Sequence, residues 1–254
     1  MDIYRARIEL LDYVFFATVE RGKVYETGPF IHNYALAYAL RLAVSPYTHA
    51  VQKPDYAREL SVLSTQRGLY LTPARPVKAL YRLTQWNTIQ EGYGLGKKPQ
   101  SIGYPDWGFA RVLRPGSVFE FYALVSQPEV SSDLPALRSL GNPGAVYIRL
   151  GKFLGKARVR FTQACTVRTG RGPFTAAIIE ERGRDREDQA TSSLLLNWRD
   201  MVMDPVVCDV YPAALPTRLI ANAQFADGNY YAAEFGEADR VVLPAGMRFL
   251  ARST

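Results

Sequence analysis

The chain has 254 residues, 48% of them hydrophobic, and carries a net charge of +7 with a pI of about 9.4. Its length and apolar content are enough to bury a core and exclude an intrinsically disordered chain. With two cysteines and two histidines, none at metal-ligand spacing, the sequence excludes a disulfide-stapled secreted domain and a four-ligand zinc site. The excess of basic residues favours a polyanionic partner.

The sequence shows no signal-peptide pattern at its start and no candidate membrane helix. The N-terminal MDIYR lacks the basic-then-apolar order of a signal peptide, and no apolar run reaches the roughly 18 residues of a membrane helix. We therefore expect a soluble, cytoplasmic protein in a reducing compartment, with no membrane partner, no metal and no cofactor.

The first part of the chain reads as a strand, a turn and a helix. Apolar and charged residues alternate from Tyr4 to Leu10, and the apolar stretch that follows predicts that the strand continues to Phe16 with a bulge at Asp12. A turn is expected at 20–23. The segment IHNYALAYALRLAV, residues 31–44, then predicts a largely apolar helix that begins after a proline and ends before another.

The middle of the chain predicts short strands around an irregular insertion. The expected strands are 69–71, 77–83, 111–113 and 118–125, and between them lies the glycine- and proline-rich segment Glu91–Phe109, here called the finger. From Leu60 to Phe119 the only acids are Glu91 and Asp106. Through Lys97, Lys98, Tyr104 and Trp107 the finger could grip phosphates and stack on bases or wedge a duplex. Its glycines lack the spacing of a nucleotide-binding loop, and a finger that packs on a partner protein remains an alternative.

The most informative segment is AVYIRLGKFLGKARVRF, residues 145–161. Both halves alternate with period two around a glycine loop, which predicts a strand pair with one apolar face and one basic face. No Asp or Glu occurs from Leu134 to Ile179. A positive surface without counter-charge favours a polyanion, with a merely solvated sheet face as the alternative. The residues expected to bind such a polyanion are Tyr147, Arg149, Gly151, Lys152, Gly155, Lys156, Arg158 and Arg160, the two glycines allowing close approach.

The remaining segments complete an α+β pattern. We expect a short helix at 134–140, a polar surface loop or linker at 181–189, and strands at 206–211, 230–235 and 240–249. This order favours an antiparallel sheet in a single domain spanning 1–254, with the finger as an insertion and 180–254 as an extension. The βαββαβ ferredoxin-like order fits these elements without being required by them.

His32 is the main candidate for catalysis. Metal-independent RNA cleavage needs a base, an acid and a positive group, and a histidine near neutral pH can supply the first. A structural histidine is the competing interpretation, because nothing in the sequence brings a tyrosine and a lysine to His32.

Several segments resemble a known family. YRARIELLDYVFFAT (4–18), NYALAYAL (33–40) and YIRLGKFLGKARV (147–159) are similar to the type I-D CRISPR member of the fifth Cas protein family. This family belongs to the repeat-associated mysterious protein superfamily, whose members have ferredoxin-like, RNA-recognition-type folds with a glycine-rich loop. Gly151, Lys152, Gly155 and Lys156 stand at the glycine-loop position, and the finger stands where relatives carry a thumb-like insertion.

The resemblance implies a non-catalytic subunit of the type I-D Cascade effector in antiviral defence. It would bind the 5′ handle of CRISPR RNA, cap the filament of backbone subunits and sit beside the large subunit. There it would help to position target double-stranded DNA near the protospacer-adjacent motif. Two alternatives remain open, a metal-independent repeat endoribonuclease using His32 and an assembly protein whose basic face meets an acidic partner.

Overall fold

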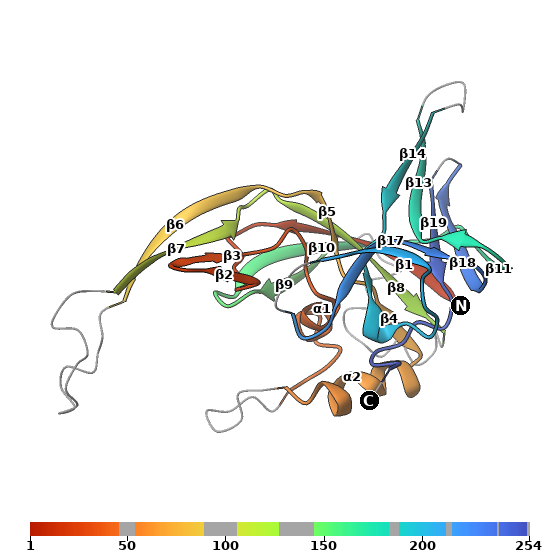
Figure 1. Cartoon of the computed structure of the whole chain (residues 1–254), viewed down its shortest axis with the longest axis horizontal. Helices are drawn as coiled ribbons and strands as arrows, with labels where there is room; N and C mark the ends of the chain where they lie inside the picture. The colour runs from red at the N-terminus through yellow and green to blue at the C-terminus, as the bar shows by residue number, and fades with distance from the viewer. Residues whose placement is uncertain are drawn as a thin grey trace.

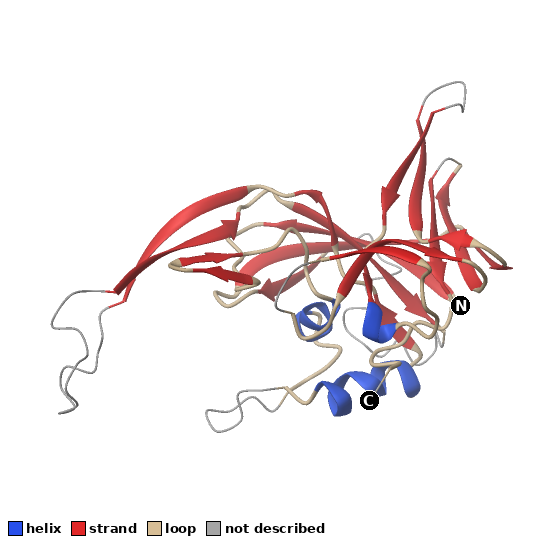
Figure 2. Ribbon diagram, viewed as in Figure 1, coloured by secondary structure: helices blue, strands red, loops and turns tan. Residues whose placement is uncertain are grey.

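The computed structural model describes residues 1–45, 54–88, 106–126, 145–182, 188–211, 215–237 and 239–252. In these ranges the fold is mostly β, built from curled and mainly antiparallel sheets with two α-helices on one side (Figure 2). The predicted antiparallel sheet is therefore confirmed, while the balance is more strongly β than the α+β expectation. The predicted helix at 134–140 lies outside the described residues.

A six-stranded antiparallel sheet forms the centre of the molecule. Its order is β4 (Leu69–Leu71), β8 (Val118–Val125), β1 (Asp2–Leu10), β10 (Gly155–Gln163) and β9 (Val146–Leu150), and β5 (Arg75–Lys78) also pairs with β8. The alternation predicted for β1 is real, since its even-numbered residues from Tyr4 to Leu10 are buried. β8 lies where the sequence placed it and is buried on both faces over most of its length.

The predicted continuation of β1 to Phe16 is wrong. The strand ends at Leu10, the chain turns at residues 11 and 12, and Asp12 accepts a hydrogen bond from the Tyr13 amide instead of forming a bulge. Val14 then forms an isolated bridge with Leu113. Residues 13–16 are apolar on both faces because Val14 and Phe16 pack in the main hydrophobic core while Phe15 packs with Ala110 and Val112. They do not extend a central strand.

The two helices lie on the same side of the central sheet (Figure 1). α1 (Asn33–Ala39) is shorter than the predicted 31–44, because Arg41 takes a left-handed backbone conformation with φ of 57° that ends the helix. α2 (Tyr56–Thr65) was not predicted. Only Leu60 and Leu63 of α2 are buried, so the helix presents a weak periodic signal.

Two long paired strands leave the body of the molecule (Figure 1). β6 (Tyr81–Thr88) pairs with β7 (Asp106–Leu113), and β3 (Val24–Glu26) and β2 (Val19–Arg21) complete a four-stranded sheet. The predicted turn before Val24 is confirmed, and the predicted strand 77–83 divides between β5 and β6. Residues 106–109 belong to β7 rather than to an irregular segment, because they pair with β6; residues 91–105 lie outside the described ranges.

The C-terminal part forms two further antiparallel sheets. One has the order β11 (Thr166–Arg171), β18 (Asn229–Gly236), β19 (Asp239–Pro244), β13 (Ala177–Arg182) and β14 (Asp188–Ser193). The other has the order β12 (Phe174–Thr175), β17 (Leu219–Phe225) and β15 (Leu196–Asn197), with β16 (Val207–Val210) also paired to β17. A 3-10 turn, η2 (Trp198–Asp200), follows β15.

The polar stretch 181–189 is part of a β-hairpin and not a linker, because its described ends pair with each other. The strands expected at 206–211 and 230–235 are confirmed, and the last strand stops at Pro244.

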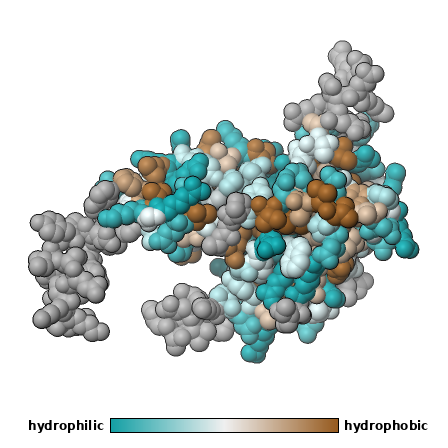
Figure 3. Space-filling view, viewed as in Figure 1, coloured by the Kyte–Doolittle hydropathy of each residue, from teal (hydrophilic) through white to brown (hydrophobic). Residues whose placement is uncertain are grey.

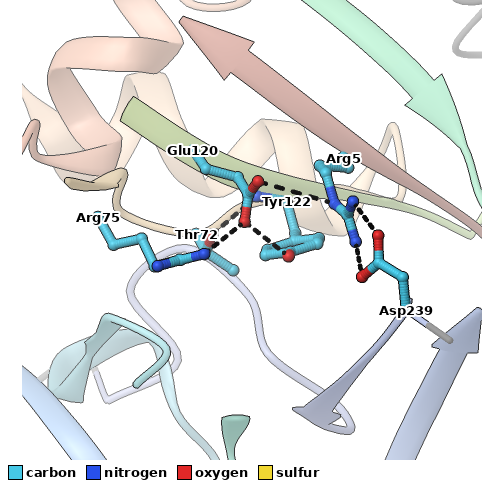
Figure 4. A network of polar contacts seen from close by, with 6 residues as sticks. All are labelled: Arg5, Thr72, Arg75, Glu120, Tyr122 and Asp239. Carbon is cyan, nitrogen blue, oxygen red and sulfur yellow. Dashed lines mark hydrogen bonds and ion pairs between the residues drawn. The ribbon is translucent and has the colours of Figure 1, made fainter. Parts of the chain in front are cut away.

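A network of charged side chains joins the central sheet to the C-terminal sheet (Figure 4). Arg5 of β1 donates two hydrogen bonds of 2.5 Å to Asp239 of β19, and its Nε lies 3.8 Å from Glu120 of β8. Glu120 also accepts from Arg75 at 3.1 Å and from the Tyr122 hydroxyl at 2.9 Å. The Arg5 side chain is only 19% exposed, so its charge depends on these partners rather than on water.

This network gives the first prediction. Replacing Arg5 by methionine leaves Asp239 and Glu120 without their shared cation, and we expect the free energy of unfolding to fall by about 2–3 kcal/mol. Arg7→Met is the matched control, because Arg7 lies on the same strand, is exposed and has no ion pair among the described residues. Denaturant unfolding measures both variants. Equal, small losses in the two would show that the network does not hold the sheets together.

Candidate nucleic-acid interface

The glycine hairpin predicted from the sequence is present. In β9 the side chains of Ile148 and Leu150 are buried while Tyr147 and Arg149 point to the opposite, exposed face. β10 repeats this alternation, with Lys156 and Arg160 exposed. The four residues 151–154 form the turn between the strands, here called the glycine turn.

Both glycines are required by close packing within the chain. A Cβ atom on Gly151 would lie 2.5 Å from the carbonyl oxygen of Phe15, and one on Gly155 would come still closer to the carbonyl oxygen of Tyr13. Gly151 also has a φ of 74°, which an L side chain rarely adopts. The sequence interpretation assigned this space to an approaching partner. The structure gives it to residues 13–15, so the interpretation of the glycines is corrected.

The rest of the glycine turn is fixed against the same segment. The Lys152 amide donates to the Phe15 carbonyl at 2.8 Å, and the Phe153 ring stacks on the Phe15 ring with centroids 5.2 Å apart. Arg149 donates to the Leu154 carbonyl at 3.2 Å. The turn therefore presents Lys152 and the exposed Phe153 from a defined backbone.

The exposed face of the central sheet carries a basic surface made by three adjacent strands, β9, β10 and β1. Its members sit opposite one another in the sheet register: Arg149 pairs with Lys156, Tyr147 with Arg158, and Arg160 with Arg7. The Lys156 ammonium lies 4.8 Å from the centre of the Tyr147 ring. We call Arg7, Tyr147, Arg149, Lys152, Lys156 and Arg160 the basic face.

Arg7 was missed as a member of the basic face. The alternation of the first strand placed it on the wet side of the sheet, but only strand pairing shows that it lies beside Arg160. These two arginines line a hollow of about 340 Å³ together with Arg158, Glu9 and Val118.

The acid-free window of the sequence is not free of counter-charge in space. β1 brings Glu9 to Arg158, and the two form an ion pair across the strands. Farther along, Arg168 and Arg171 lie near Glu234 and Asp227. The expectation of an unneutralised surface is therefore wrong for these arginines. It holds for Arg149, Lys152, Lys156 and Arg160, which have no ion pair among the described residues.

Comparison with known proteins identifies the family. Residues 1–252 match the family model described as type I-D CRISPR-associated protein Cas5/Csc1. The chain belongs to this Cas5/Csc1 family. The resemblance inferred from the sequence is thereby confirmed, and the match covers nearly the whole chain. No curated protein matches it.

Three solved structures resemble this Cas5/Csc1 chain at low identity. A chain of the type III-B Cmr-beta complex bound to cognate target RNA is 14% identical, covers 64% of this chain and 60% of its own, and has a TM-score of 0.41. A chain of that complex with target RNA and AMPPnP is 10% identical over 88% and 85%, with a TM-score of 0.42. A CRISPR protein from Archaeoglobus fulgidus is 14% identical over 96% and 100%, with a TM-score of 0.40. The Cas5/Csc1 chain thus spans 60% of the first of these chains.

Most of the residues predicted to contact DNA lie outside the described ranges. Lys97, Lys98 and Tyr104 fall in the gap between β6 and β7, and only the backbone of Trp107 is placed, in β7. Their role in this Cas5/Csc1 chain stays a prediction.

A second exposed surface was not anticipated from the sequence. Figure 3 shows apolar side chains gathered near the middle of one face of the molecule. Val202, Val206, Val207 and Val210, in and before the edge strand β16, are each at least half exposed. Exposed apolar patches of this kind often mark contacts with another protein.

His32 is buried and structural in its geometry. It caps the N-terminus of α1, where Nδ1 accepts a hydrogen bond from the Tyr34 amide at 3.2 Å, and its Nε2 lies 2.8 Å from the Thr217 hydroxyl. Burial lowers the pKa of His32 to about 3. A group that stays neutral at pH 7 with both nitrogens bonded is poorly placed to take a proton from RNA.

Asp200 was missed because its partners come from three segments that are far from it in the sequence. Its buried carboxylate accepts hydrogen bonds from the Asn33 amide at 2.7 Å, the Tyr34 hydroxyl at 3.1 Å, the Tyr70 hydroxyl at 3.3 Å and the Leu250 amide at 2.9 Å. Burial raises the pKa of Asp200 to about 6, although these donors favour the charged form. The carboxylate joins α1, β4, η2 and the C-terminal segment.

Two kinds of feature are absent from the described residues. No group of three or more His, Cys, Asp or Glu side chains there is arranged to hold a metal ion. No helix in those ranges has the length and apolar character needed to cross a membrane.

The second prediction concerns the protonation of His32. Because the folded pKa lies below the unfolded value of 6.5, the unfolded chain binds a proton first, and stability falls as the pH drops below 6.5. His32→Asn keeps a good helix cap and removes this term. From pH 7 to about pH 5 we expect the wild type to lose about 2 kcal/mol relative to the variant in denaturant unfolding. The other histidine, His49, is present in both proteins and cancels. Parallel pH profiles would mean that His32 titrates normally in the folded state, as a catalytic base would.

Proposed function

We propose that this Cas5/Csc1 chain is a non-catalytic subunit of a type I-D CRISPR Cascade effector and binds the 5′ handle of CRISPR RNA on its basic face. Family membership supports an effector subunit. The observation that carries the handle-binding proposal is the row of Arg149, Lys156, Arg160 and Arg7 on neighbouring strands, which have no ion pair among the described residues. Such a row favours an extended chain of phosphates.

The geometry of the basic face suits single-stranded RNA. Successive phosphates run past Lys152 on the glycine turn, then Lys156 and Arg149, then Arg160 and Arg7. Tyr147 is 57% exposed in the middle of this row and offers a ring on which an unstacked base can lie. Arg158 is paired with Glu9, so its charge is less available to the RNA than that of the unpaired cations.

The ferredoxin-like interpretation of the central sheet is part of this proposal. The strands β4, β8, β1 and β10 are adjacent and antiparallel, and the α1–α2 segment connects β1 to β4. In that interpretation β8 lies between β1 and β4, and β1 lies between β8 and β10, as in two interleaved βαβ units. The connection from β8 to β9 runs through residues outside the described ranges.

The remaining partners follow from the same assignment. The subunit caps the filament of Cascade backbone subunits and adjoins the large subunit, for which the exposed valines around β16 offer an apolar contact surface. The finger, which connects β6 to β7 in the sequence, helps to position target double-stranded DNA near the protospacer-adjacent motif. The buried, doubly hydrogen-bonded His32 supports a subunit without nuclease activity.

The third prediction tests the basic face. Lys152→Ala combined with Lys156→Ala removes two phosphate contacts. We expect weaker binding of 5′-handle RNA and a salt slope reduced by about 1.4 units, since each single-strand contact contributes about 0.7. The charge-matched control is Arg168→Ala with Arg171→Ala, on the exposed surface of another sheet. Fluorescence anisotropy at several salt concentrations measures both.

Three results would contradict the proposal. If the two double variants bound alike, the RNA would lie elsewhere. If the RNA were cut in EDTA by the wild type but not by His32→Asn, the chain would be an endoribonuclease. If the complex assembled normally without RNA and lost a protein partner in the Lys152/Lys156 variant, the basic face would serve an acidic protein.

The fourth prediction tests the finger. Replacing Lys97 and Lys98 by alanine should weaken binding of target DNA by the assembled complex while leaving handle RNA binding unchanged, because neither lysine belongs to the basic face proposed to bind the RNA. Binding is compared across targets with different flanking motifs. Unchanged DNA binding for every motif would remove the finger from the DNA path.

A further inference from the structure

A groove lies between α1 and β9, on the opposite side of β9 from most of the basic face. Its volume is about 650 Å³, within the range of pockets that hold small organic groups. Tyr38, Ala39 and Leu40 of the helix end form one wall, and Ile148, Leu150 and Leu154 form the other. β9 ends the strand order of the central sheet, so among the described strands it pairs with β10 alone and its other edge borders the groove.

The charged groups of the groove are two arginines, Arg41 and Arg149, and none of the residues described as lining it is acidic. Arg41 is exposed, and its side chain makes no hydrogen bond or ion pair with a described residue. Arg149 is also exposed, and its described partner is the Leu154 carbonyl. An apolar groove with two unneutralised cations complements an anion that carries a flat apolar group.

Two of the four described non-glycine residues with a left-handed backbone line this groove. Arg41 and Leu154 have φ values of 57° and 53°, a left-handed conformation that costs energy for any residue with a bulky side chain. Arg41 directly follows the C-cap of α1, the position where glycine is the usual residue. An arginine at this position gives up stability that glycine would provide, which indicates that its side chain is needed.

From these observations we infer that the groove holds one unstacked nucleotide of the bound single-stranded RNA. Its base lies against the apolar walls and its phosphate lies between Arg41 and Arg149. Arg149 belongs both to the basic face and to the groove, so RNA that follows the basic face reaches the groove by passing the edge of β9. The inference rests on the proposed function and adds a base-holding site to its phosphate contacts.

The experiment compares short oligo(A) and oligo(U) RNAs with an abasic oligoribonucleotide of the same length, using the full chain and fluorescence anisotropy. Ala39→Phe fills the groove, and Val44→Phe, at a position that is 77% exposed, is its matched control. Ala39→Phe should weaken binding of the base-containing RNAs about tenfold, the value of one stacked base, and leave the abasic RNA unaffected. Val44→Phe should change neither.

Arg41→Gly provides a second variant that does not depend on filling the groove. It should raise the midpoint of thermal unfolding, because glycine relieves the left-handed backbone, and it should weaken binding of both kinds of RNA. A merely structural arginine would change the unfolding midpoint alone.

The outcomes separate this inference from the proposed function. Wild-type binding of RNA that is unaffected by Ala39→Phe and Arg41→Gly, but lost in the Lys152/Lys156 variant, overturns the groove and keeps the basic face. Failure of the wild type to bind any of the RNAs overturns both. Variants that bind RNA normally but fail to join a protein partner would assign the groove to a protein segment and overturn the inference.

Discussion

Much of this structure depends on the close packing of residues 13–16 between the glycine turn and the four-stranded sheet of β2, β3, β7 and β6. Val14 exchanges two backbone hydrogen bonds with Leu113 of β7, and Phe15 packs on Ala110 and Val112. On its other side Phe15 stacks on Phe153, and its carbonyl accepts from Lys152. This packing is possible only because Gly151 and Gly155 carry no side chain. The glycine turn, which we propose binds RNA, and the strand β7 therefore both pack against the same segment, residues 13–16.

The pairing of strands explains why the sequence predicted only part of the surface charge. A run without acids is visible along the chain, but counter-charges arrive from neighbouring strands. β1 supplies both Glu9, which neutralises Arg158, and Arg7, which adds to the positive charge beside Arg160. Strand register therefore decides which cations of the basic face remain unpaired. Arg5 on the same strand has a third role, because it is turned toward Asp239 and holds two sheets together.

Elements governed by local pattern were predictable, and those governed by tertiary packing were not. β9 and β10 follow clear period-two alternation and β8 is an almost continuous apolar run, and all three were predicted close to their observed bounds. α2 was missed because it buries only two leucines, and residues 106–109 were taken as loop because glycine and proline dominate the finger around them. For the site, the sequence identified Lys152 and Lys156 but not Arg7 or Arg41, whose relevance depends on strand pairing and on the backbone at the end of α1.

The polar groups of the molecule divide into two sets with different physical roles. Buried groups such as His32 and Asp200 have their hydrogen bonds satisfied within the chain, and burial shifts the pKa of each toward its neutral form. Their effects on stability oppose each other. Asp200 favours folding most at low pH and loses that contribution as the pH rises through about 6, whereas His32 loses its contribution as the pH falls below 6.5. The exposed set, on β1, β9 and β10, is cationic and has unsatisfied charge. Among the described residues, these buried groups are bonded within the fold, and the unpaired cations of the basic face lie on neighbouring strands of one sheet, which supports the proposed binding of a polyanion.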